Sequence, residues 1–165
     1  MQLDSAVVMS SPSNTDRQSG QGSAERAHSE EPIRILMAED NAINQRVGKL
    51  ILQRAGFTID LAGDGSEALE AHRACPYEII LMDCQMPIMD GFEACRQIRS
   101  LSQVQPVIIA VTANALVGER ERCLAAGMDD YLSKPFQAEQ LISLVRKWIA
   151  VRRGNALYSA TPREQ

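Results

Sequence analysis

The 165-residue sequence is poor in aromatic side chains and contains no apolar run near the length of a membrane-spanning helix. The apolar patch at positions 6–9 is too short for the hydrophobic region of a secretory signal peptide. The formal net charge of −4 gives no electrostatic basis for binding nucleic acid. These absences predict a cytoplasmic protein that has no membrane segment. A chain of this length can bury enough surface in one domain to fold without a metal or a disulfide.

The sequence also lacks the Cys-x-x-Cys spacing of local zinc sites. Its cysteines lie at positions 75, 84, 95 and 123. The spacing therefore predicts no zinc site, and we interpret the cysteines as small buried or half-buried apolar side chains. Cys84 differs from the other three only in that it adjoins Asp83, a candidate reactive residue.

Two segments lack a sustained apolar period. Residues 1–31 are rich in Ser, Gln, Gly, Asn and Glu, and residues 151–165 are polar and unpatterned. We predict a disordered tail or linker at 1–31, a folded domain at 32–150 and a C-terminal tail at 151–165. His28 lies in the first segment, where no helical pattern surrounds it, and we assign it no role.

Between these segments, short apolar runs alternate with amphipathic stretches, which predicts five strands that are each followed by a helix. The predicted strands are 33–38, 57–62, 78–82, 107–111 and 130–133. The first helix carries one apolar face and ends at Gly56. Its face consists of Ile43, Val47, Leu50 and Ile51. We expect Asp64 to cap the second helix, His72 to lie on that helix's surface, and the fourth helix to cover 116–126.

Several of the predicted strands are continuous apolar runs, which is typical of a parallel sheet with helices on both faces. Right-handed crossovers then favour an α/β fold with a doubly wound, five-stranded parallel sheet. In the strand order 2-1-3-4-5, the sheet changes direction between the first and third strands. Ligands of open α/β sheets bind outside the carboxyl ends of the strands at such a point.

Polar side chains follow four of the five predicted strands. Glu39 and Asp40 come after the first strand, Asp83 after the third, Thr112 after the fourth and Lys134 after the fifth. Each of these residues alone is explained as a helix cap or a solvated side chain. Their joint placement at one edge of the sheet favours a functional site instead.

Three carboxylates in one cleft repel each other, by about 4 kcal/mol for a pair ~4 Å apart at an effective dielectric constant of 20. A cation resolves this repulsion, and an open site with only oxygen ligands suits Mg²⁺. A metal, a lysine and a hydroxyl that converge on one further carboxylate are typical of phosphoryl transfer to that carboxylate.

Four motifs in this order carry a family resemblance: ILMAEDN at 35–41, LMDCQMPIMDG at 81–91, VTANA at 111–115 and YLSKP at 131–135. Over about residues 32–150 the sequence resembles the receiver domain of two-component response regulators, most of all the receivers of hybrid sensor histidine kinases. The resemblance implies a flavodoxin-like receiver fold and a phosphoacceptor role in a phosphorelay. It implies a histidine kinase or a histidine phosphotransfer protein as partner, and a weak homodimer is compatible with it.

By this resemblance, Asp83 matches the phosphoacceptor, and Lys134 matches the lysine that pairs with a phosphoryl oxygen. Asp40 matches a direct Mg²⁺ ligand, Glu39 a ligand that acts through water, and the backbone carbonyl of Gln85 a third protein ligand. A receiver of this kind assists its own phosphorylation and dephosphorylation, and is not a conventional enzyme.

The resemblance also implies a conformational switch. Thr112 matches the hydroxyl that moves toward the phosphoryl group, and Tyr131 matches the aromatic side chain that then turns inward. The response is expected on the face formed by the fourth helix, fifth strand and fifth helix. Pro135 is expected to follow a cis peptide bond. Gln85 and Asn114 occupy positions that tune the dephosphorylation rate in the family.

Of four alternative functions, three require residues that this sequence lacks. A haloacid-dehalogenase-type phosphatase needs a second acid at the position of Gln85, and a flavin carrier needs a hydroxyl-rich loop where Glu39 and Asp40 stand. The phosphate-binding motif GxxxxGK[ST] is absent. A pseudo-receiver, which would be a docking module that works without phosphorylation, stays open, and a Mg²⁺ titration would discriminate it.

The context of the domain is ambiguous as well. We expect no output domain after residue 150, so the chain is either a stand-alone regulator or the receiver of a hybrid sensor kinase. The polar segment before Pro32 is typical of an interdomain linker and favours the second interpretation.

Overall fold

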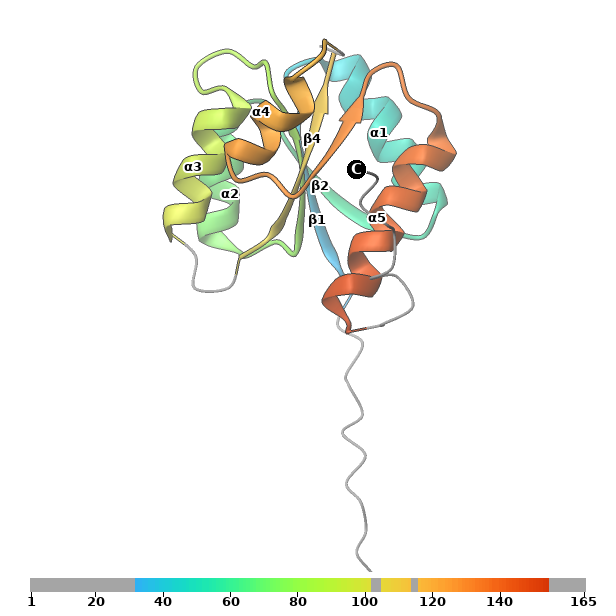
Figure 1. The fold of residues 1–165 in the computed structure, drawn as a ribbon. Helices are drawn as coiled ribbons and strands as arrows, with labels where there is room; N and C mark the ends of the chain where they lie inside the picture. The colour runs from blue at the N-terminus through green and yellow to red at the C-terminus, as the bar shows by residue number, and fades with distance from the viewer. Residues whose placement is uncertain (1–31, 102–104, 114–115, 155–165) are drawn as a thin grey trace, which may run out of the picture. The chain divides into compact units, whose positions relative to one another are not determined.

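Five parallel strands form one sheet in the order β2-β1-β3-β4-β5, as the sequence predicts (Figure 1). The structure is a computed structural model that describes residues 32–101, 105–113 and 116–154. The strands are β1 (Arg34–Ala38), β2 (Thr58–Ala62), β3 (Ile79–Asp83), β4 (Val107–Thr112) and β5 (Asp130–Ser133). Every residue of β3 and β4 is buried, because these strands lie inside the sheet and are covered on both faces.

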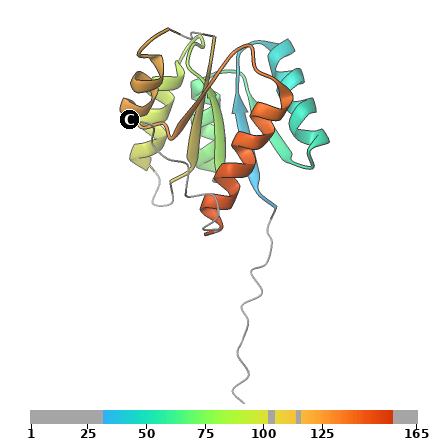
Figure 2. The same cartoon turned by 45° about the vertical axis from the view of Figure 1, so that its right-hand side comes forward.

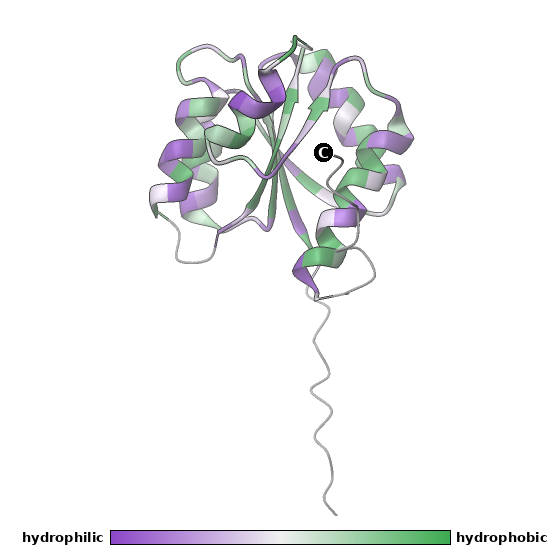
Figure 3. Ribbon diagram, viewed as in Figure 1, coloured by the Kyte–Doolittle hydropathy of each residue, from purple (hydrophilic) through white to green (hydrophobic). Residues whose placement is uncertain are grey.

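Helices connect the strands and cover both faces of the sheet (Figures 1 and 2). They are α1 (Ala42–Arg54), α2 (Gly65–Ala74), α3 (Gly91–Leu101), α4 (Glu119–Ala125) and α5 (Ala138–Arg152). Helices α1 and α5 pack on one face, and α2, α3 and α4 pack on the other. Two apolar cores result, one on each side of the sheet, and the hydrophobic colouring of the strands follows them (Figure 3).

Two local predictions at helix ends are confirmed. The Asp64 carboxylate accepts hydrogen bonds from the backbone N–H groups of Ser66 (2.7 Å) and Glu67 (2.9 Å), and so caps α2. Gly56 follows the end of α1 with a φ of 90°, a left-handed conformation that glycine adopts without steric cost. The Lys134–Pro135 peptide bond is cis, also as predicted.

The apolar face that the sequence assigns to α1 is largely exposed. Ile43 is 72% exposed, and Val47 and Leu50 are each 49% exposed. The helix packs instead through Gly48 and Leu52. A Cβ at Gly48 would lie 2.6 Å from the Met37 sulfur, so the glycine lets α1 approach β1 closely. Of the predicted face, only Ile51 packs against the core. The other three residues form an exposed surface, which we call the α1 patch (Ile43, Val47 and Leu50).

The placement of His72 on a helix surface is wrong. Its side chain is 3% exposed, and its Nδ1 accepts a hydrogen bond from the Tyr77 backbone N–H at 3.1 Å. Burial, with a smaller contribution from the Arg99 charge, lowers the pKa of His72. The histidine is therefore held as a neutral acceptor inside the fold.

The predicted start of the fourth helix is also wrong. Helix α4 begins at Glu119 rather than at 116, because Gly118 takes a left-handed conformation with a φ of 91° and interrupts the helical backbone. Of the cysteines, Cys84, Cys95 and Cys123 are buried as expected, whereas Cys75 is exposed. Within the described residues, none of the helices is long and apolar enough to span a membrane.

The predictions for the tail at 1–31, for His28 and for Asn114 fall outside the described residues, as does most of the predicted C-terminal tail.

Candidate functional site

The register of the sheet brings the predicted site residues to its carboxyl edge. Strand β1 pairs with β3 so that Ala38 lies opposite Met82, which sets Glu39 level with Asp83. Asp83 is the last residue of β3, and Thr112 is the last residue of β4. Lys134 directly follows β5, and its backbone N–H donates to the Thr112 carbonyl at 2.8 Å. Glu39, Asp83 and Lys134 thus lie close together at the carboxyl ends of β1, β3 and β5.

Lys134 contacts both buried acids at this edge. Its Nζ lies 2.5 Å from Glu39 Oε2 and 2.5 Å from Asp83 Oδ2. Glu39 and Asp83 are 1% and 6% exposed, although the three residues are far apart in sequence. Burying charged groups costs free energy unless they are paired, so this cluster is not explained by packing alone.

Further hydrogen bonds orient the two carboxylates. Asp83 Oδ1 accepts from the Gln85 backbone N–H at 2.8 Å. Glu39 Oε1 accepts from Asn44 Nδ2 at 2.9 Å, and Gln45 Nε2 donates to the Glu39 carbonyl at 2.7 Å. Sequence reasoning missed Asn44 and Gln45. The available signal was two amide side chains in the first turn of a helix that starts beside the acid pair.

The pKa values show how the cluster is held. Burial raises the pKa of Asp83, although the hydrogen bonds from Lys134 and from the Gln85 N–H act in the opposite direction. Burial alone would lower the pKa of Lys134, but its hydrogen bonds to Asp83 and Glu39 outweigh this and raise it. Lys134 therefore remains an ammonium cation between two carboxyl groups.

A third carboxylate completes the cluster. Asp40 is exposed, and it can place a carboxylate oxygen within 4.8 Å of oxygens of Glu39 and Asp83. The cluster thus contains three acidic side chains and one ammonium group. Oxygen donors of this kind, one of them open to water, fit a hard cation such as Mg²⁺. Asp40 and Gln85 also line an open cleft of about 580 Å³ beside the cluster.

Gly91, the first residue of α3, brings the loop after β3 close beneath Asp83. A Cβ at this position would lie 2.1 Å from the Asp83 carbonyl oxygen, so only glycine fits. The Gly91 N–H donates to the Cys84 carbonyl at 3.3 Å. The close contact holds the end of β3, and with it the Asp83 side chain, against the rest of the edge.

The two predicted switch residues lie on neighbouring strands. Thr112 is fully buried at the end of β4, beside the cluster. Tyr131 is half-buried on β5 and packs against the core on the α2–α3–α4 side of the sheet. The fold therefore brings together four of the predicted site residues, Glu39, Asp40, Asp83 and Lys134. Tyr131 lies instead on the face that is predicted to change on phosphorylation.

Comparison with known proteins identifies the family. The sequence model described as the response regulator receiver domain matches residues 35–146, which is more than half of the chain. The chain belongs to this family. It is a response regulator receiver domain of two-component signalling, and its closely related sequences are receivers within hybrid histidine kinases.

Two curated relatives illustrate the similarity. Over 149 residues, 86% of the chain, it is 36% identical to the hybrid signal transduction histidine kinase K of Dictyostelium discoideum. Over 115 residues, 69% of the chain, it is 39% identical to the histidine-protein kinase BarA of Escherichia coli. The matched regions span only 12% of the length of each relative.

Solved structures agree with the fold. The receiver domain of a sensor histidine kinase from Pseudomonas aeruginosa, crystallised with a magnesium ion in its active-site cleft, is 42% identical. The match has a TM-score of 0.65 and covers 73% of this chain and 99% of that one. The receiver of a Saccharomyces cerevisiae response regulator, co-crystallised with a histidine phosphotransfer protein, is 30% identical with a TM-score of 0.69. That match covers 73% of this chain and 91% of the other.

Proposed function

We propose that this receiver domain accepts a phosphoryl group on Asp83 from a phosphohistidine, with Mg²⁺ held by Glu39, Asp40 and Asp83. The observation that carries the proposal is the contact of Lys134 with both Glu39 and Asp83 at the carboxyl edge of the sheet. The ammonium group marks the place where the oxygens of an incoming phosphoryl group would be stabilised.

In the proposed reaction, an Asp83 carboxylate oxygen attacks phosphorus. An O–P bond forms, the P–N bond to the histidine breaks, and the imidazole keeps the electron pair of that bond. Mg²⁺, when bound, supplies positive charge to the phosphoryl oxygens. Lys134 exchanges its contact with Asp83 for one with a phosphoryl oxygen, and the Thr112 hydroxyl approaches another. The Gln85 N–H keeps Asp83 oriented.

Mg²⁺ fits the side chains that are present. Glu39, Asp40 and Asp83 offer carboxylate oxygens within 4.8 Å of one another, and the exposure of Asp40 leaves room for water ligands. The Gln85 backbone carbonyl is proposed as the third direct protein ligand beside Asp40 and Asp83, with Glu39 acting through water. The receiver from Pseudomonas aeruginosa, crystallised with magnesium in its active-site cleft, supports the same assignment here.

The proposed output is a change of the face formed by α4, β5 and α5. Thr112 ends β4, and its carbonyl accepts from Lys134, so a shift of both residues toward a phosphoryl group would be transmitted to β5. Tyr131 lies on β5, half-buried, and would turn further inward as Thr112 moves. Packed interfaces of this type change between discrete arrangements, and so a small movement can bias a larger one.

The α1 patch is the proposed docking surface for a helix of a histidine phosphotransfer protein or histidine kinase. Its three large apolar side chains are exposed on the helix that begins beside Asp40. Val47 also lines a cavity of about 440 Å³ together with Glu39 and Lys134, so the patch continues into the site. The yeast complex of a receiver with a phosphotransfer protein supports a partner of this chemistry.

Phosphoryl uptake is tested with phosphoramidate, a small donor that has the same P–N bond as phosphohistidine. With Mg²⁺ present, intact mass is expected to show the gain of one phosphoryl group, and removal of Mg²⁺ by EDTA is expected to abolish it. Asp83→Asn should not gain the group. The matched control is Asp90→Asn, because Asp90 lines the same cleft and its Oδ1 accepts from the Glu93 backbone N–H at 2.8 Å in the first turn of α3.

A chain that binds no Mg²⁺ and gains no phosphoryl group would instead be a pseudo-receiver, a docking module that works without phosphorylation. Gain of the group by Asp83→Asn would move the phosphoacceptor elsewhere and refute the site assignment. Titration of the wild-type chain with Mg²⁺ separates these two outcomes, because only the pseudo-receiver fails to bind the ion.

The partner surface needs a separate experiment. Leu50→Asp should slow phosphotransfer from a phosphorylated histidine phosphotransfer protein by at least about tenfold, while uptake from phosphoramidate stays unchanged, because Leu50 belongs to the α1 patch and is not among the residues that line the cavity beside Lys134. Val151→Asp is the matched control, because Val151 is an exposed apolar residue of α5. Equal transfer rates for the two variants would contradict docking on the α1 patch.

We further propose that residues 32–150 act as one receiver unit of a hybrid histidine kinase. The matched family region and the relatives support this proposal. Limited proteolysis should leave a resistant fragment with ends near these positions. Resistance that extends through residues 1–31 would contradict the predicted boundary.

A further inference from the structure

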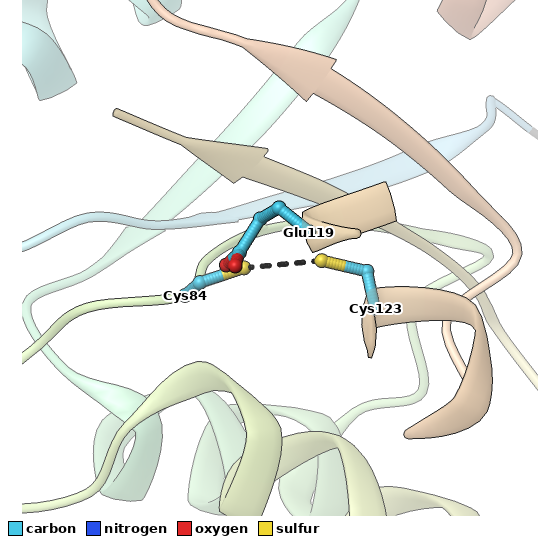
Figure 4. Close-up of side chains that lie close together, drawn as sticks. All are labelled: Cys84, Glu119 and Cys123. Atoms are coloured by element: carbon cyan, nitrogen blue, oxygen red, sulfur yellow. Dashed lines mark hydrogen bonds between the residues drawn. The ribbon is translucent and has the colours of Figure 1, made fainter. Parts of the chain in front are cut away.

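Two cysteines and a glutamate from two separate segments of the chain meet in the fold (Figure 4). Cys84 directly follows β3, and Glu119 and Cys123 both belong to α4. Glu119 and Cys123 are four residues apart, which puts their side chains on one face of the helix. The three residues are 1%, 7% and 0% exposed, respectively. Their ligand atoms all lie within 4.8 Å of one another.

We propose that Cys84, Cys123 and Glu119 form a second metal site, for a thiophilic divalent cation such as Zn²⁺. The two sulfur atoms lie 3.7 Å apart. Two thiolates at ~2.3 Å from a tetrahedral zinc ion have their sulfur atoms roughly 3.8 Å apart, so the spacing already fits coordination. A carboxylate oxygen of Glu119 supplies the third ligand, and the fourth position is left for water.

The chemistry of the ligands separates this site from the acidic cluster. Thiolates select zinc and similar soft ions, whereas an all-oxygen set such as Glu39, Asp40 and Asp83 selects Mg²⁺. The two sites share no side chain, although Cys84 and Asp83 are consecutive residues. Each site would therefore bind its own class of ion from a mixture.

An ion can reach the thiol site from the open cleft. Cys84 lines this cleft of about 580 Å³ together with Arg122 and Phe92. The Arg122 guanidinium lies 3.8 Å from the Glu119 carboxylate, a long distance for an ion pair, and the Arg122 side chain is 63% exposed. The guanidinium also lies 4.2 Å from the centre of the Phe92 ring, a contact that Arg122 would exchange for solvent when a cation takes its place beside Glu119. Binding then replaces two thiol protons, which pass to solvent, by one divalent ion.

A disulfide fits the same pair less well. An S–S bond of ~2.05 Å would require the two sulfur atoms to approach each other by more than an ångström, and two electrons would have to pass to an oxidant. Metal coordination needs almost no change in the sulfur–sulfur distance. A bound ion would tie α4 to the end of β3, directly beside Asp83.

The test uses Co²⁺, whose bonds to thiolates give an ultraviolet charge-transfer band that carboxylate ligands do not give. The full chain, kept reduced and with Mg²⁺ in excess to fill the acidic site, is titrated with Co²⁺. The double variant Cys75→Ser/Cys95→Ser removes the other two thiols. We expect it to bind one equivalent with the band present, and Zn²⁺ to displace the Co²⁺ and remove the band.

Single substitutions in that background assign the ligands. Cys84→Ser and Cys123→Ser should each lose the band, and Glu119→Gln should weaken binding at least tenfold. The proposal is overturned if the double variant shows no band, if the band survives Cys84→Ser, or if the metal only promotes an intramolecular disulfide, seen as the loss of two hydrogens in intact mass. If a variant with a further substitution does not fold, the presence or absence of the band in the double variant alone tests the proposal. The readout is independent of phosphorylation at Asp83.

Discussion

Two lysines of the described residues contact carboxylates that are buried or half-buried, and the surroundings of the two differ. Lys147 of α5 lies 2.8 Å from Asp130, whose carboxylate also accepts from the Trp148 indole N–H at 2.9 Å and from the Tyr131 N–H at 2.9 Å. The Asp130 carboxylate thus accepts hydrogen bonds from one cationic donor and two neutral donors. Lys134 instead stands between Glu39 and Asp83, with Asp40 close to both.

The pKa values of the two aspartates shift in opposite directions. Burial would raise the pKa of Asp130, but the hydrogen bonds from Lys147, the Tyr131 N–H and Trp148 outweigh it and lower that pKa. At Asp83 burial prevails and raises the pKa. The Asp130 cluster is thus balanced and stabilises the fold, whereas the Asp83 cluster keeps an excess of negative charge. We infer that this excess is retained for a cation.

The largest expected effect separates the two lysines. Lys134→Ala should reduce the rate of phosphoryl uptake from phosphoramidate by at least about 100-fold, because it removes a donor that stabilises charge in the transition state. Lys147→Ala should leave that rate unchanged and lower the free energy of unfolding by about 1 kcal/mol. Intact mass against time measures the rates. Similar losses of uptake in both variants would remove the distinction between the clusters.

The second prediction concerns the backbone that holds Asp83. Gly91→Ala should lower the free energy of unfolding by about 1–3 kcal/mol, because its methyl group would clash with the Asp83 carbonyl. Gly63→Ala is the matched control, since its Cβ would meet only the flexible end of Glu67, at 3.2 Å. Urea unfolding measures both. If the two glycines tolerate alanine equally well, the close approach beneath Asp83 is not structurally required.

The third prediction tests the balanced cluster. Asp130→Asn should lower the free energy of unfolding by about 2 kcal/mol, since three hydrogen bonds to a charged group are weakened, and phosphoryl uptake should continue. The pKa of Asp130 is lowered in the fold from its ordinary value of 3.8. The carboxylate therefore stabilises the fold fully at pH values above 3.8, and this stabilisation is lost as the pH falls through the lowered pKa. Acid titration of unfolding should therefore bring wild type and variant together at low pH. A difference that grows as pH falls would contradict this account.

The smallest expected effect concerns a buried group outside both clusters. The pKa of His72 is lowered in the fold from its ordinary value of 6.5, so the native state binds fewer protons than the unfolded state below that pH. The contribution of His72 to the free energy of unfolding is complete above pH 6.5. It declines as the pH falls below that value, by at most about 1.4 kcal/mol per pH unit. His72→Gln should flatten this slope in urea unfolding at several pH values. An unchanged slope in His72→Gln would show that the imidazole is not held neutral.

Much of this architecture could be predicted from the sequence, because it follows from local patterns. The strand order, the cap at Asp64 and the end of α1 near Gly56 are confirmed. The gathering of Glu39, Asp83 and Lys134 followed from a general property of parallel sheets, whose carboxyl ends meet at one edge.

Other features depend on contacts between distant segments, and the sequence could not show them. The apolar pattern of α1 looks the same in the sequence as that of a helix that faces the core. Which side of the helix packs is decided by the close approach of Gly48 to Met37 of β1, which the sequence does not show. His72 is buried by its contact with Tyr77, and the meeting of Cys84 with Cys123 depends on how α4 packs. In each case the deciding neighbour comes from another element of the fold.

The most direct test of the central claim asks which aspartate carries the phosphoryl group. After incubation with phosphoramidate and Mg²⁺, borohydride reduction converts an aspartyl phosphate into a stable alcohol that peptide mass spectrometry can locate. We expect modification at Asp83 and none at Asp130, with Asp83→Asn unmodified throughout. Modification at Asp130, or at any position in Asp83→Asn, would contradict it.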